Sequence, residues 1–229
     1  RATPTSLGLL LGLLLGTQAG CGGAAPAVNG GAEAETPAQR AAADAVALRG
    51  GHTAEVTGAA YRPDGAMIVT SSEDHTARIW DARTGVLTAV LENHVDQVNG
   101  VAYAPDSSLI ATAGGDGFVV LWDPRSASPP RKLGRGSSGL WHVAFSPDSR
   151  FVVTAGLDGM ADIWNTRDGS LEVSLEGHEG IIWDAEFSPD GGRVVTASAD
   201  GTASLWDART GARMAVMTGH GADVFGAHF

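Results

Sequence analysis

The chain has 229 residues, a formal net charge of −11 at pH 7 and one cysteine. Its 15 basic residues are scattered along an acidic chain, which argues against a nucleic-acid-binding surface, so we expect no nucleic-acid partner. A single cysteine excludes an intramolecular disulfide and a multi-cysteine metal site.

Residues 1–20 are predicted to form a signal peptide. Arg1 precedes the apolar run LGLLLGLLL at residues 7–15, and small residues follow it. The run is too short to span a bilayer as a helix, which needs about 20 apolar residues. We therefore expect export of the chain.

The sequence Ala19-Gly20-Cys21 resembles the lipobox of bacterial lipoproteins, although Gln18 stands where that family usually has Leu. The resemblance implies acylation of Cys21 and a lipid anchor in the cell envelope. Gly22 after the cysteine favours the outer membrane over the inner one if the source is a bacterium with two membranes. The alternative is an ordinary secretory signal followed by a cysteine that is there by chance.

Residues 21–43 are predicted to form a flexible tether. They consist mainly of Gly, Ala, Pro, Glu and Thr, with almost no large apolar side chains. Such a segment cannot bury enough surface to offset the entropy lost on ordering.

The remainder, residues 44–229, repeats with a period of 42 residues and no insertion across four units. Each unit carries a Trp, with an acidic residue six positions before it. The pairs are Asp74 and Trp80, Asp116 and Trp122, Asp158 and Trp164, and Asp200 and Trp206. A fixed period of this length indicates a repeat architecture. We place the repeats at about 52–93, 94–135, 136–177 and 178–219, with a fragment at 220–229.

Each repeat reads as four short antiparallel strands. In the fourth repeat the apolar or β-branched runs are 181–187, 193–198, 202–206 and 212–217, separated by SPDGG, ADG and DARTG. Turns of this composition between such runs indicate hairpins. In the first repeat His75 takes the place of the turn Gly, at a position that requires positive φ.

These units resemble the WD-repeat (WD40) β-propellers, whose marks are Gly-His at the start of a unit and Trp-Asp at the end of its third strand. The matching pairs are Gly51-His52, Gly177-His178, Gly219-His220, Trp80-Asp81, Trp122-Asp123 and Trp206-Asp207, with variants at Asn93-His94 and Trp164-Asn165. The resemblance implies an all-β fold of four-stranded antiparallel blades. We expect an incomplete propeller of four full blades plus the first strand of a fifth.

The resemblance also implies one hydrogen-bonded tetrad of Trp, Ser or Thr, His and Asp in each blade. The expected complete tetrads are His52, Ser72, Asp74, Trp80 and His178, Ser198, Asp200, Trp206; the expected partial ones are His94, Asp116, Trp122 and Asp158, Trp164. A His–Asp pair can serve as a general base. Because this pair recurs with a Trp in successive blades, a structural role is the favoured interpretation.

A candidate partner-binding face is expected at the edge where the first strands begin. Its residues lie five positions after that of the repeat's His, or just before the turn Asp: Thr57, Asn99, Trp141, Trp183, Phe225, Glu73 and Leu157. The aromatic members either pack between blades as core or form an exposed binding surface, since Trp and Phe are typical anchors.

The chain contains no nucleophile elbow, phosphate-binding loop or zinc motif. We expect a protein without a cofactor that is not an enzyme but a scaffold for protein–protein interactions at the cell envelope. Two alternatives stay open. One is a sensor or docking propeller of a larger enzyme or transport assembly. The other is a ligand or metal site in the channel, for which Gly58, Gly100 and Gly226 offer few polar groups.

Overall fold

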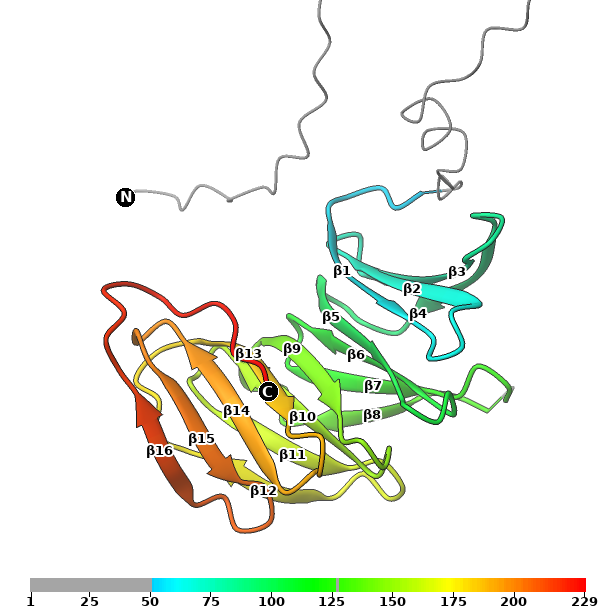
Figure 1. Ribbon diagram of the computed structural model, residues 1–229. Coiled ribbons are helices and arrows are strands. Elements are labelled where there is room, and N and C mark those ends of the chain that lie inside the picture. Colours follow the sequence, from blue (N-terminus) through cyan, green and yellow to red (C-terminus); the bar gives the residue numbers. More distant parts are fainter. Residues whose placement is uncertain (1–50, 127) are drawn as a thin grey trace, which may run out of the picture. The chain divides into compact units, whose positions relative to one another are not determined.

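The structure is a computed structural model that describes residues 51–126 and 128–229 (Figure 1). The expected signal peptide, Cys21 and the tether lie outside the described residues. Within the described part of the chain, no helix is long and apolar enough to cross a membrane.

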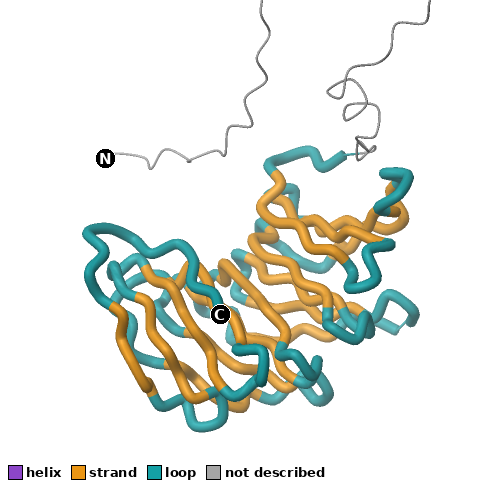
Figure 2. Tube along the Cα trace, viewed as in Figure 1, coloured by secondary structure: helices purple, strands orange, loops and turns teal. Residues whose placement is uncertain are grey.

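The regular elements of the described residues are sixteen β-strands, which form four antiparallel four-stranded sheets (Figure 2). Blade 1 contains β1 (Val56–Tyr61), β2 (Met67–Ser72), β3 (Thr76–Asp81) and β4 (Leu87–Glu92). Blade 2 contains β5 (Val98–Tyr103), β6 (Ile110–Gly114), β7 (Phe118–Trp122) and β8 (Arg131–Gly134). Blade 3 contains β9 (Leu140–Phe145), β10 (Phe151–Gly156), β11 (Ala161–Asn165) and β12 (Leu171–Leu175). Blade 4 contains β13 (Ile182–Phe187), β14 (Arg193–Ser198), β15 (Ala203–Asp207) and β16 (Arg213–Met217). The all-β fold of four-stranded blades is therefore confirmed.

The turn between the second and third strands fixes the register of each blade. Gly117, Gly159 and Gly201 occupy this turn in blades 2 to 4 with φ of 78°, 78° and 81°. His75 takes the same place in blade 1 with φ of 69°. Histidine is one of the few residues with a side chain that enters this region of backbone conformation at moderate cost.

The hydrophobic core lies between the blades rather than inside them. Buried Val69 and Ile79 of blade 1 pack with Tyr103 and Ile110 of blade 2. The two later junctions are built in the same way, with clusters shared by blades 2 and 3 and by blades 3 and 4. The first strands contact one another in the order β1, β5, β9, β13 (Figure 1). Each blade therefore depends on its neighbours for burial, as repeat architectures require.

The segment at 220–229, expected to be the first strand of a fifth blade, contains no strand in the structure. It follows β13 through side-chain contacts, with the Ala227 amide donating to Asp184 Oδ2 at 3.1 Å and His228 Nδ1 lying 2.9 Å from Glu186 Oε2. A first strand is held by the second strand of its own blade, and the described residues contain no such strand next to 220–229. The segment therefore lies beside β13, where the first strand of a fifth blade is expected, but it forms no strand.

Candidate interaction surface

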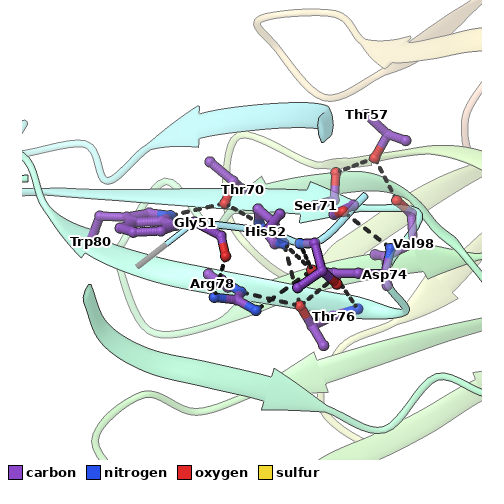
Figure 3. Close-up of polar contacts among 12 residues, drawn as sticks. Gly51, His52, Thr57, Thr70, Ser71, Asp74, Thr76, Arg78, Trp80 and Val98 are labelled. Carbon is purple, nitrogen blue, oxygen red and sulfur yellow. Dashed lines mark hydrogen bonds and ion pairs between the residues drawn. The ribbon is translucent and has the colours of Figure 1, made fainter. Parts of the chain in front are cut away.

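A chain of hydrogen bonds crosses blade 1 from the core to the turn (Figure 3). Trp80 Nε1 donates to Thr70 Oγ1 at 2.9 Å, Thr70 Oγ1 lies 2.7 Å from His52 Nε2, and His52 Nδ1 lies 2.9 Å from Asp74 Oδ2. Because the carboxylate only accepts, Nδ1 carries the proton and Nε2 accepts from the threonine hydroxyl. The network is thus fully satisfied.

The same network recurs in blades 2 and 4. In blade 2 the three contacts measure 3.0, 2.8 and 3.0 Å and join Trp122, Thr112, His94 and Asp116. In blade 4 they measure 2.8, 2.7 and 2.7 Å and join Trp206, Thr196, His178 and Asp200. Blade 2 therefore has a complete tetrad, and the expectation of a partial one was wrong.

The hydroxyl member of each tetrad is a threonine, which corrects the assignment to Ser72 and Ser198. Trp80 lies opposite Ile68 in the β2–β3 register, so Thr70 is its diagonal neighbour and Ser72 lies two residues further along the strand, out of reach. Ser72 instead accepts from the Asp74 amide at 3.1 Å, and Ser198 does the same for Asp200. These serines hold the turn that presents the aspartate.

The missed threonines carried their own signal in the sequence. Thr70, Thr112, Thr154 and Thr196 follow the same 42-residue step as the tryptophans. The periodicity that identified the other tetrad members would have identified them as well.

Blade 3 lacks the tetrad histidine because Gly136 stands in its place. Trp164 Nε1 still donates to Thr154 Oγ1 at 3.4 Å, and Asp158 Oδ1 accepts from the Met160 amide at 3.2 Å. No histidine of the described residues links the Trp164–Thr154 pair to the Met160–Asp158 pair, as one does in the other blades.

A different polar network is found nearby in blade 3. Arg135 donates to Ser174 Oγ at 2.8 Å and to Asp162 Oδ1 at 3.3 Å, and Ser174 donates to the same carboxylate oxygen at 2.6 Å. Burial raises the pKa of Asp162, while Ser174 and Arg135 act to lower it. Blade 3 therefore carries an ion pair between the exposed Arg135 and the buried Asp162 that no sequence motif indicated.

The tetrad aspartates are held ionised. Burial acts to raise the pKa of Asp74, but hydrogen bonds from Thr76, Thr53 and His52 outweigh it and hold the pKa well below its usual range. The pKa of Asp200 is lowered for the same reasons. Burial lowers the pKa of His94 in blade 2, which favours its neutral form.

The tetrad histidines are closed to substrates. The side chains of His52, His94 and His178 are 3%, 1% and 0% exposed. A general base must reach the proton that it removes, so this burial favours a structural role for the three histidines. Among the described residues, no group of three or more His, Cys, Asp or Glu side chains is arranged to hold a metal ion.

The predicted interaction residues at the start of the first strands connect consecutive blades. Thr57 donates to the Val98 carbonyl at 2.5 Å and Asn99 donates to the Leu140 carbonyl at 2.8 Å. At the following junctions aromatic rings replace these hydrogen bonds. Trp141 and Trp183 meet edge to face at 5.1 Å between centroids, and Trp183 lies 5.8 Å from Phe225.

The three rings, Trp141, Trp183 and Phe225, are named the aromatic rim. They combine both interpretations left open by the sequence, because they pack between blades and yet stay accessible. Trp141 is 39% exposed and Phe225 69% exposed, and Leu157, before the turn Asp of blade 3, is 41% exposed. Glu73 is also exposed, on blade 1, whereas Asn99 is buried.

A family model described as "WD domain, G-beta repeat" matches the chain four times in succession, at residues 46–81, 85–123, 128–165 and 169–207. No match was found among curated proteins.

Proposed function

Because the chain belongs to the WD40 repeat family, we propose that it is a non-catalytic scaffold that binds a protein partner through the aromatic rim. WD40 repeat proteins are typically non-catalytic and generally mediate protein–protein interactions. The observation that carries the proposal is the accessibility of Trp141 and Phe225 on consecutive junctions of a rigid frame.

Exposed aromatic rings held by neighbouring rings lose little entropy on binding. Such residues are the usual anchors of protein interfaces, where a few side chains supply most of the binding energy. Trp183 supports both Trp141 and Phe225, so the rim is organised before a partner arrives. The tetrads keep the underlying strands in register.

The charge around the rim favours a partner with basic groups. Four exposed acidic residues lie on loops or turns at this edge of the blades: Glu55, Glu73, Asp96 and Asp223. Charges at the edge of an interface mainly raise the association rate and exclude wrong partners. We therefore expect binding to slow as salt is added.

The place of action that we propose is the bacterial cell envelope, with Cys21 as the lipidation site. The support is the sequence pattern at residues 1–21 alone. Mass spectrometry of the protein from the membrane fraction, compared with a Cys21→Ser variant, tests it. Acyl mass on Cys21 and release of the variant from membranes are the expected results, and an unmodified Cys21 would refute the anchor.

The binding proposal is tested by affinity capture from envelope extracts with wild type, Trp141→Ala, Phe225→Ala and the control Val90→Ala. Val90 is exposed to the same extent as Trp141, but it lies on the outer strand β4. We expect one protein to be lost with both rim variants and retained with the control. Capture that is equal for all four folded proteins would contradict the proposal. If the captured protein is an enzyme or a transporter subunit, the alternative of a docking propeller is favoured.

A further inference from the structure

The junction between blades 3 and 4 contains a hollow of about 340 Å³, at the opposite end of β13 from Trp183. We propose that it binds a small amphipathic anion, with an apolar body between the blades and a carboxylate on Arg209. This site is separate from the aromatic rim and does not depend on the proposed function.

The inner wall of the hollow is apolar. It consists of Phe151, Ile163 and Val173 of blade 3 and Phe187 and Ala208 of blade 4. All five belong to, or pack against, the core cluster shared by these blades. The hollow is thus an accessible edge of the core, and its volume lies in the usual range for small-molecule sites, about 300 to 1,000 Å³.

The equivalent hollow between blades 2 and 3 differs in chemistry, which shows why this one is apolar. Arg131 and Thr166 line it, and Arg131 crosses to the carbonyls of Thr166 and Arg167. One period later these positions are Val173 and Ala208. The polar side chains that bridge blades 2 and 3 are therefore absent between blades 3 and 4.

The hollow is open because blade 4 has two glycines in its first turn. Gly191 replaces Ser149, whose Oγ accepts from the Asp106 amide across the neighbouring junction at 3.2 Å. Gly192 replaces Arg150, so the turn of blade 4 lacks this long side chain as well. Gly191 and Gly192 therefore place no side chain over the apolar wall.

The charge at the mouth of the hollow decides the class of ligand. Arg209 is exposed at the mouth of the hollow, and the nearby Asp207, whose pKa it helps to lower, accepts its side-chain hydrogen bond from Thr210. Glu172 also lines the hollow, and Asn165 of blade 3 donates to its Oε1 at 3.0 Å, which holds the carboxylate on the blade 3 side. Arg209 is therefore the side chain of the hollow that can donate hydrogen bonds to a ligand, and guanidinium pairs well with a carboxylate.

Calorimetric titration with phenylbutyrate, phenylbutanol and phenylbutylamine tests the inference. These probes share an apolar body and differ in the charge of the head group. We expect phenylbutyrate to bind at one site, phenylbutanol to bind about tenfold more weakly, and phenylbutylamine to bind weakest. Absence of phenylbutyrate binding, or binding of the amine as tight as that of the acid, would overturn the proposal.

Two variants and a matched control locate the site. Arg209→Gln should weaken phenylbutyrate about tenfold and leave phenylbutanol unchanged. Gly192→Leu should abolish binding of both probes by filling the hollow, since a Cβ at this position meets nothing closer than Asp190 Oδ1 at 3.4 Å. Arg167→Gln alters the equivalent arginine of blade 3 and should change nothing. Equal losses with Arg167→Gln and Arg209→Gln would place the anion elsewhere and refute the site.

Discussion

At the residue scale, the stability of a blade depends on one threonine hydroxyl that accepts from Trp Nε1 and contacts His Nε2. In blade 1 this hydroxyl belongs to Thr70, on a strand whose inner residues are fully buried. A buried polar atom that loses its only partner costs more than the hydrogen bond itself contributes. Thr70 should therefore matter more than Ser72, although both are buried hydroxyls on the same strand.

Thr70→Val keeps the shape of the side chain and removes its hydroxyl. Trp80 Nε1 and His52 Nε2 then lose their partner in the core, which should cost about 2 to 3 kcal/mol of unfolding free energy. Ser72→Ala, the control, removes one contact to a turn amide and should cost about 1 kcal/mol. Urea unfolding of both variants measures the difference. A larger loss for Ser72→Ala would restore the assignment that the sequence suggested.

His94 gives the fold a dependence on pH. Its pKa is lowered from 6.5 by burial, so the unfolded chain binds a proton at a pH where the folded chain does not. The stability that this shift contributes is fully present above about pH 6.5. It is lost as the pH falls from there to the pKa of His94 in the folded protein. His94→Gln should show a smaller loss than wild type between pH 7.5 and pH 5 in urea unfolding. A loss as large as that of wild type would show that His94 is not the group responsible.

At the element scale, blade 3 is the exception to the repeat. Gly136 removes the tetrad histidine, and its φ of 62° lies in the left-handed region, which few residues with a side chain adopt at moderate cost. A Cβ atom at Gly136 would also lie only 2.5 Å from the ring of Phe118, so a histidine has no room there. The Arg135–Asp162 pair lies in the same blade, whereas blade 2 has Val120 in place of Asp162. Removing only the arginine leaves the Asp162 carboxylate desolvated and without its cation.

Arg135→Met should destabilise the protein by about 1 to 2 kcal/mol, because Asp162 keeps its buried carboxylate without the cation. The pKa of Asp162 is already raised, so the carboxyl is more easily ionised in the unfolded chain and the penalty should grow as pH rises from 4 to 7. The double variant Arg135→Met/Asp162→Val, which has the blade 2 residue at position 162, should regain most of the loss. Thermal unfolding at both pH values checks this, and a double variant no better than the single one would contradict it.

The sequence predicted the blades well and the sites less well, for a physical reason. Strand positions follow from period and turn residues, which are local. The threonine of the tetrad depends on cross-strand register, so choosing Ser72 over Thr70 was an error of two residues along one strand. The hollow beside Arg209 depends on which side chains are missing at a junction between two repeats, and it becomes visible only when the repeats are packed.

At the scale of the whole molecule, the repeats give two different surfaces at opposite ends of the first strands. At the rim end, the residues at the blade junctions differ from one junction to the next. Thr57 and Asn99 lie at the first junctions, and aromatic residues lie at the later ones. The other end carries the Gly191–Gly192 turn and the hollow. Because the blades share one fold while the residues at their edges differ, these edges are suited to the recognition of a partner. The proposed function depends on the aromatic rim.

The most direct test of this account is site-specific photo-cross-linking in envelope extracts. A photoreactive phenylalanine analogue is placed at Phe225 or Trp141 on the aromatic rim, and at Val90 or Met214 on the outer strands β4 and β16, which are also exposed. The account predicts one cross-linked protein, shared by both rim positions and absent from both outer positions. Cross-linking of that protein at Val90 and Met214, or no cross-link from the rim, would contradict it.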